Sequence, residues 1–163
     1  MADPNALERL HDAAALWSAG LGDNREIVLA ACDALADGLD GYALAMLAGL
    51  PLRECTAGDV GEFLEAALGD VGVRYYAPES RGADEAVLAV MARRTLAGAL
   101  SPRSLASFAH RVFGHDRLPL AERLAALDDD YDAIGFVFTN TEELDADVVA
   151  EARRIVDRVA ERG

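Results

Sequence analysis

Lysine is absent from this chain: all 15 basic residues are arginine, against 29 acidic residues, and the net charge is −14. A missing lysine together with abundant alanine is typical of a GC-rich bacterial genome. The charge itself bears on partners, because a strongly acidic surface repels a phosphate backbone unless its basic residues cluster. Arginines adjoin only at Arg93-Arg94 and Arg153-Arg154, each with acids nearby. The sequence therefore argues against nucleic-acid binding.

Cysteine and long apolar runs are also scarce. Cys32 and Cys55 are the only cysteines, so we expect no disulfide framework and interpret both as reduced thiols. The longest uncharged stretch, residues 42–52, has eleven residues, whereas a membrane-spanning helix needs about 20. Residues 1–4 lack the basic region and apolar core of an export signal. We expect a cytoplasmic protein that binds no membrane and needs no cofactor or metal.

Aromatic residues make up only 6% of the chain, although 52% of its residues are hydrophobic. Much of the hydrophobic content is alanine, which favours close helix–helix packing over a large aromatic centre. A chain of 163 residues has the usual length of one domain and can bury about 70% of the surface that its unfolded form exposes. We therefore expect a single helical domain over residues 1–163.

Helix start and stop signals divide the chain into segments. Ser101-Pro102 is the clearest start, a capping hydroxyl followed by proline at the first helical position. Three further starts are Asp3-Pro4, Asp23 with Glu26, and Thr56 with Asp59. The segments with helical period cover residues 4–19, 23–37, 42–48, 57–68, 84–100, 102–113, 120–134 and 142–159. Short loops between them predict an all-α fold, an irregular bundle of about seven helices.

A histidine-containing run offers the best candidate for chemistry. His110, His115 and Asp116 lie close in sequence, and such groups can ligate a metal or transfer a proton near neutral pH. The His115-Asp116 pair resembles the helical HD metal phosphohydrolases, which place another histidine ligand well upstream and an aspartate well downstream. His110 is too close for that pattern and His11 is too far.

The spacing of the two histidines argues against a shared site. Positions i and i+5 on one helix are rotated by about 140° from each other, so we expect the rings of His110 and His115 not to converge. Gly114 also suggests that His115 lies beyond the helix end. The simpler interpretation is a histidine that interacts with the last helical carbonyls and a neighbouring acid.

Three aspartates partly match a calcium-binding loop. Asp128, Asp130 and Asp132 occupy positions 1, 3 and 5 of that pattern, but Ala133 stands where glycine is needed and Thr139 where glutamate is needed. A helical period of apolar residues also continues through the aspartates. We therefore expect a helix here and not a calcium loop.

The acidity extends well beyond these three residues. From Asp128 to Glu151 there are nine carboxylates and no basic residue. One interpretation is a solvated acidic face, and the other is a docking surface for a basic protein partner. Phe136, Val137 and Phe138 can supply an apolar anchor for docking or can fill the core. The candidate docking residues are Asp128, Asp129, Asp130, Asp132, Phe136, Phe138, Glu142, Glu143, Asp145 and Asp147.

Several runs give the chain a family resemblance. They are Ser101-Pro102-Arg103-Ser104-Leu105, His110-Arg111-Val112-Phe113-Gly114-His115, Leu127-Asp128-Asp129-Asp130-Tyr131-Asp132 and Leu47-Ala48-Gly49-Leu50. Over about residues 40–160 the chain resembles small acidic all-helical actinobacterial proteins of unknown function. This resemblance implies no catalytic residue. The general look is also similar to that of bacterial immunity proteins, which neutralise basic toxins.

Three functions follow from these patterns. The leading hypothesis is a non-enzymatic protein-binding module, with an immunity-type inhibitor as its most specific form. The first alternative is a small metal-dependent hydrolase that uses His110, His115 and Asp116. The second is a helical scaffold or regulator that self-associates through an exposed apolar seam. The identity of a partner or substrate and the oligomeric state stay open.

Overall fold

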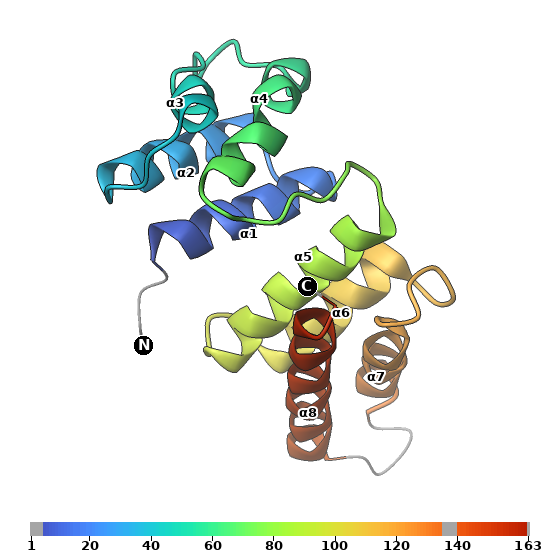
Figure 1. Ribbon diagram of the computed structural model, residues 1–163. Coiled ribbons are helices and arrows are strands. Elements are labelled where there is room, and N and C mark those ends of the chain that lie inside the picture. Colours follow the sequence, from blue (N-terminus) through green and yellow to red (C-terminus); the bar gives the residue numbers. More distant parts are fainter. Residues whose placement is uncertain (1–4, 135–139, 163) are drawn as a thin grey trace. The chain divides into compact units, whose positions relative to one another are not determined.

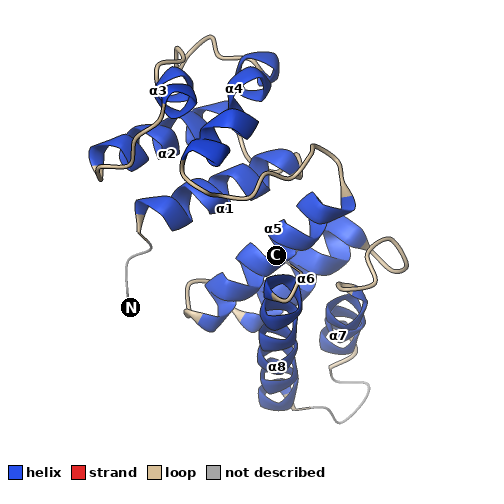
Figure 2. Ribbon diagram, viewed as in Figure 1, coloured by secondary structure: helices blue, strands red, loops and turns tan. Residues whose placement is uncertain are grey.

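The computed structural model describes residues 5–134 and 140–162 of the chain. These residues form eight α-helices and no strand (Figure 2), which confirms the predicted all-α fold. The sequence predicted about seven helices. Contacts between residues divide the chain into two compact units, residues 1–84 and 85–163. The single domain over residues 1–163 stays a prediction.

The first unit contains four helices (Figure 1), which surround an aliphatic core. They are α1 (Ala6–Ser18), α2 (Asn24–Ala36), α3 (Tyr42–Ala48) and α4 (Ala57–Asp70). α1 packs on α2, and α2, α3 and α4 pack on one another. Each helix contributes fully buried side chains to the core, among them Leu10, Ile27, Leu44 and Leu64. Buried alanines such as Ala31 and Ala67 lie among them, as expected for closely packed helices.

Capping boxes start the three longer helices of this unit. The side chains of Asp23 and Thr56 each accept a hydrogen bond from the backbone N–H three residues on, and the acid at that position accepts one from the backbone N–H of the capping residue, as predicted. α1 differs from the prediction, because its cap is Asn5, paired with Glu8. The predicted cap Asp3 and its neighbour Pro4 lie outside the described residues.

α3 is capped from another helix. No side chain of its own caps its N-terminus; instead, Asp70 Oδ2 accepts hydrogen bonds from the backbone N–H groups of Ala43 at 2.8 Å and Leu44 at 3.1 Å. Gly41 lies so close that an added Cβ would stand 2.4 Å from Asp70 Cβ. α4 therefore continues to Asp70, past Gly69, where the sequence predicted its end.

The second unit contains the other four helices. They are α5 (Arg81–Leu96), which includes the boundary between the units, α6 (Pro102–Phe113), α7 (Glu122–Asp132) and α8 (Thr141–Ala160). α6, α7 and α8 pack on one another in pairs. Their buried side chains include Leu105, Leu124, Leu127 and Ile155. Ser101 caps α6 with Pro102 at its first position, which confirms that start signal.

Candidate metal centre and acidic surface

α6 and α7 run antiparallel, and polar pairs along their contact show the register. Arg103, near the start of α6, places Nη2 3.5 Å from Oδ1 of Asp132 at the end of α7. At the other end, His115 places Nδ1 2.8 Å from Oε1 of Glu122, the first residue of α7. α6 and the residues that follow it therefore face α7 along most of its length.

The chain turns sharply where α6 ends. Gly114 has a φ of +60°, in the left-handed region that glycine adopts without steric cost. His115 therefore lies off the helix, and its ring turns back towards that of His110, with the ring centroids 5.1 Å apart. The expectation that these rings do not converge was wrong, because the 140° rotation applies only while both residues stay on one helix.

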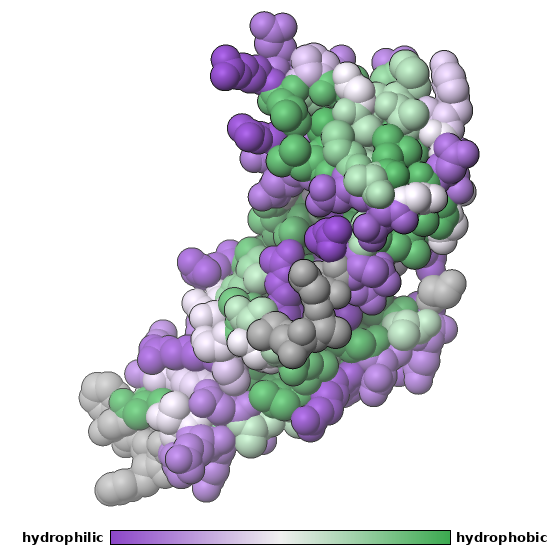
Figure 3. Space-filling model, turned by 90° about the vertical axis from the view of Figure 1, so that its left-hand side faces the viewer, coloured by the Kyte–Doolittle hydropathy of each residue, from purple (hydrophilic) through white to green (hydrophobic). Residues whose placement is uncertain are grey.

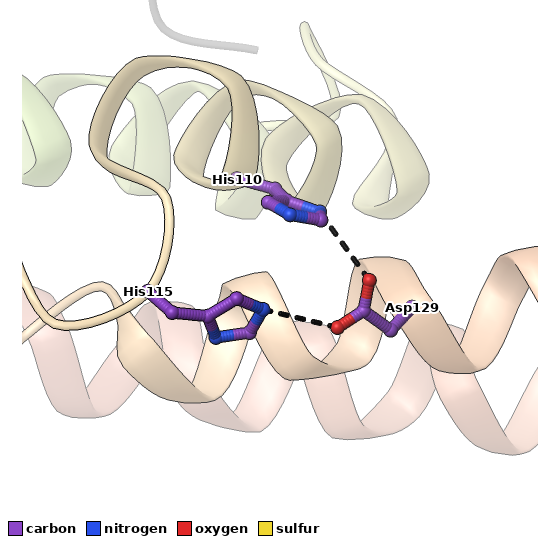
Figure 4. Close-up of side chains that lie close together, drawn as sticks. All are labelled: His110, His115 and Asp129. Carbon is purple, nitrogen blue, oxygen red and sulfur yellow. Dashed lines mark hydrogen bonds and ion pairs between the residues drawn. The ribbon is translucent and has the colours of Figure 1, made fainter.

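Asp129 of α7 completes a three-residue cluster with the two histidines (Figure 4). Its Oδ1 lies 3.6 Å from His110 Nδ1, and its Oδ2 lies 3.1 Å from His115 Nε2. One ligand atom from each of the three side chains lies within 4.8 Å of the other two. The carboxylate thus connects rings that come from α6 and from the loop after it.

Two further carboxylates support the cluster from α7. Asp128 Oδ2 lies 3.0 Å from His110 Nδ1, and Asp128 is mostly buried, with its side chain 14% exposed. Hydrogen bonds to Glu122 and then to Asp129 raise the pKa of His115 above its ordinary value. The same bond from His115, together with one from the Asp116 backbone, lowers the pKa of Glu122. These acids therefore orient both rings, and Glu122 and Asp129 favour the protonated form of His115.

Asp116, the carboxylate of the hydrolase hypothesis, takes a different place. Its backbone has a φ of +71°, and its N–H donates to Glu122 Oε2 at 3.0 Å. Its side chain does not belong to the cluster of potential metal ligands among the described residues. Asp129 supplies the carboxylate that the hydrolase hypothesis assigned to Asp116, so the candidate ligands are His110, His115 and Asp129.

Sequence reasoning missed this use of Asp129 and missed Glu122 altogether. The signal was present on α7, where Leu124, Leu127 and Tyr131 form the predicted apolar seam and are all buried. Residues that flank such an apolar seam lie at the edge of the contact with the neighbouring helix. Using that signal requires the antiparallel register with α6, which the spacing in α7 alone does not give.

The aspartates of the incomplete calcium pattern lie on α7 itself, and α7 continues through Asp132. This confirms the predicted helix at Asp128, Asp130 and Asp132. Thr139 lies outside the described residues, as do Phe136, Val137 and Phe138, the proposed apolar anchor.

The carboxylates of the acidic segment differ widely in exposure. Asp128 and Asp145 are partly buried and Glu151 is buried, so the sequence-based docking set does not lie entirely on an open face. Six of the nine carboxylates are exposed, namely Asp129, Asp130, Asp132, Glu142, Glu143 and Asp147.

Pairing removes several of these groups from a free surface. Asp132 pairs with Arg103, Asp147 with Arg123 and Glu151 with Arg154, while Asp145 accepts a hydrogen bond from the Tyr131 hydroxyl. Among the described residues, Asp130, Glu142 and Glu143 form no such side-chain pair. Asp130, Glu142 and Glu143 are therefore the centre of what we call the acidic surface.

The self-association hypothesis needs exposed apolar side chains. The first unit has several, including Leu29 of α2 and Met46 of α3, which are 41% and 39% exposed. Figure 3 shows hydrophobic side chains at the surface of its upper part, where α2, α3 and α4 lie in Figure 1. Nothing on this face indicates what covers it, and self-association stays a prediction.

No model of a protein family matches the chain, and searches of curated proteins and of solved structures returned no similar protein. The resemblance to acidic helical actinobacterial proteins therefore stays a prediction. In the described part of the chain, no helix combines the length and the apolarity needed to cross a membrane.

Proposed function

We propose that this chain is a non-enzymatic, cytoplasmic protein-binding module whose acidic surface docks a basic protein partner. The observation that carries the proposal is the distribution of charge at the end of α7. Four of its last five residues are aspartates, and no basic residue lies in its last turn.

This arrangement opposes the local electrostatics of the helix. Carbonyl groups make the C-terminus of a helix negative, so each carboxylate there is disfavoured by about 0.3–1 kcal/mol when exposed. His110, His115 and Arg103 pair with Asp128, Asp129 and Asp132, whereas Asp130 has no such partner among the described residues. Local conflicts of this kind are expected where a surface serves binding.

α8 extends the acidic surface with less strain. Glu142 and Glu143 are exposed in its first turn, where negative charge stabilises the helix. Because α7 and α8 pack on each other, and one ends shortly before the other begins, both groups of acids lie at the same end of this helix pair (Figure 1).

The overall charge of −14 supports a basic partner. Opposite charges on two proteins steer their encounter and make the association rate fall steeply with salt. Neutralisation of a basic toxin, as by an immunity protein, is the most specific form of this proposal. Its partner class is a protein and not a nucleic acid, because the same charge repels phosphates.

The test compares two double variants with identical changes in net charge. Asp130→Arg with Glu143→Arg reverses the acidic surface, whereas Glu54→Arg with Glu62→Arg reverses two exposed acids of the first unit. A partner captured from the native cell should associate more slowly with the first variant, and added salt should reduce the rate for the wild type most. Circular dichroism should show both variants folded, because surface substitutions shift stability by about 0.5 kcal/mol. If both variants associate with the partner at the same rate, the acidic surface is not the docking surface.

A second candidate, the small metal-dependent hydrolase, is favoured by one observation. His110, His115 and Asp129 converge and would hold the ion, which would supply an activated water as the nucleophile. The zinc-loaded protein should hydrolyse an activated phosphodiester or ester, and Asp129→Asn should abolish this activity. If the zinc-loaded protein hydrolyses neither substrate, the hydrolase candidate is excluded and the docking role is the remaining proposal.

A further inference from the structure

We propose that His110, His115 and Asp129 form a binding site for one divalent transition-metal ion, with Zn²⁺ as the fitting example. This inference does not depend on the docking role, because the docking variants leave all three ligands unchanged. It concerns binding alone, so it also stands apart from the hydrolase candidate.

The ligand set determines the class of metal. Two imidazoles and one carboxylate suit Zn²⁺, Co²⁺, Ni²⁺ or Cu²⁺, whereas Ca²⁺ and Mg²⁺ prefer oxygen ligands only. A cluster of acids alone would say little about a metal, since such groups are often solvated. The two histidine rings distinguish this cluster from the acidic segment, Asp128 to Glu151, which contains no histidine.

The geometry requires little rearrangement. Ligand atoms about 2.0–2.2 Å from a tetrahedral zinc ion stand ~3.4 Å apart, and the three atoms here lie within 4.8 Å of one another. His115 Nε2 and Asp129 Oδ2 are already 3.1 Å apart. To hold one ion, the widest separation would have to shrink by at most about 1.4 Å.

An outer carboxylate prepares His115 for this role. With Nδ1 facing Glu122 Oε1 at 2.8 Å, Nε2 is the nitrogen directed at Asp129 and at the ion. A carboxylate behind a histidine ligand fixes the tautomer and orientation of the ring, and replacing such a partner weakens metal binding about 10–100-fold. Glu122 is itself held by the N–H of Asp116 at 3.0 Å. Glu122 is therefore a positioning residue of the proposed site.

The surroundings also favour a cation. Asp128 places a mostly buried carboxylate beside His110, and the C-terminal turns of α6 and α7 both contribute negative potential. The side chains of His110, His115 and Asp129 are 32%, 41% and 56% exposed. An ion therefore reaches the site from solvent and keeps water in its remaining coordination positions.

The test measures metal uptake by the full chain after dialysis against a chelator. Zn²⁺ titrated calorimetrically should bind with a stoichiometry of one, and Co²⁺ should give the visible absorption of a nitrogen- and oxygen-ligated ion. His110→Gln, His115→Gln and Asp129→Asn should each weaken Zn²⁺ binding at least as much as Glu122→Gln, about 10–100-fold.

Two matched controls come from the chain itself. His11→Gln removes the third histidine, which lies in α1 beside Asp12, and Asp157→Asn removes an exposed acid of α8 outside both proposed sites. Both should bind Zn²⁺ like the wild type. In the NMR spectrum of the wild type, Zn²⁺ should shift the ring resonances of His110 and His115 but not those of His11, which keeps the test valid if a variant fails to fold.

Three results would overturn the proposal. The first is no stoichiometric uptake of Zn²⁺ or Co²⁺, and the second is unchanged affinity in His115→Gln. The third is Ca²⁺ binding as tight as Zn²⁺ binding, which would indicate carboxylates acting alone. None of these results affects the association rates that test the docking role, so failures of the two proposals are distinguishable.

Discussion

Replacing Asp70 tests whether α3 depends on a cap that another helix supplies. In Asp70→Ala, the backbone N–H groups of Ala43 and Leu44 lose the carboxylate oxygen that they share at 2.8 and 3.1 Å. Loss of a capping side chain costs about 0.5–2 kcal/mol. Asp70 is exposed, whereas Ala43 and Leu44 are buried, so water reaches the freed N–H groups only in part and we expect a cost near the middle of that range.

A second effect acts in the opposite direction. Asp70 is the last residue of α4, where a negative charge opposes the helix dipole by about 0.3–1 kcal/mol. Removing it relieves that repulsion, so we expect a net loss of about 1 kcal/mol in the free energy of unfolding for Asp70→Ala. Asp70→Asn keeps an acceptor oxygen for the cap. Its lost negative charge destabilises the N-terminus of α3 and stabilises the C-terminus of α4, so the two effects offset each other. It should stay within about 0.5 kcal/mol of the wild type.

The assay is urea unfolding followed by the fluorescence of Trp17, the only tryptophan, which packs against the core of the first unit. Gly41→Ala should reproduce the loss, because its Cβ would displace the Asp70 side chain, while Glu62→Ala on the exposed side of α4 serves as the control. Hydrogen exchange should show faster exchange at Ala43 and Leu44 in Asp70→Ala. Wild-type stability in Asp70→Ala, or an equal loss in Asp70→Asn, would refute the capping argument.

Two further predictions concern the start of α4. Hydrogen bonds from the hydroxyl and backbone N–H of Thr56 lower the pKa of Asp59, so its stabilisation is present above the ordinary pKa of 3.8 and is lost as pH falls through the lower folded value. The stability difference between wild type and Asp59→Asn should therefore shrink from neutral pH towards strongly acidic pH, and a constant difference would contradict this. Burial, and then Asp59, raise the pKa of the Cys55 thiol, whereas Cys32 is exposed. Iodoacetamide should therefore modify Cys32 before Cys55, which mass spectrometry would show. Faster modification of Cys55 would contradict the raised pKa of its thiol.

The helices could be predicted from the sequence because their signals are local. A capping residue and its acid three positions on act within one turn, which is why the starts at Asp23, Thr56 and Ser101 were all correct. The start of α1 was placed too early because Asp3-Pro4 and Asn5 with Glu8 offer competing local signals. Asn5 and Glu8 form the capping box.

The candidate metal site could not be predicted in the same way, because it depends on two non-local facts. One is the chain reversal at Gly114, which takes His115 off the helix. The other is the register between α6 and α7, which places Asp129 against both histidines and Asp116 outside the cluster. Spacing along one helix contains neither fact.

The hydrogen bond from Tyr131 to Asp145 has a consequence for association. Tyr131 is buried in α7, and its hydroxyl donates to a carboxylate in the second turn of α8, so the end of one helix is tied to the start of the next. Acids on mobile segments would have to be ordered when a partner arrives, at about 0.5–1.5 kcal/mol for each immobilised side chain, and their backbone would have to be ordered as well. Here the helices that carry Asp130 and Glu143 are held in place before the encounter. A partner would meet a preorganised pattern of charge, and the complex should form with a smaller entropic penalty than one built on a loose acidic tail.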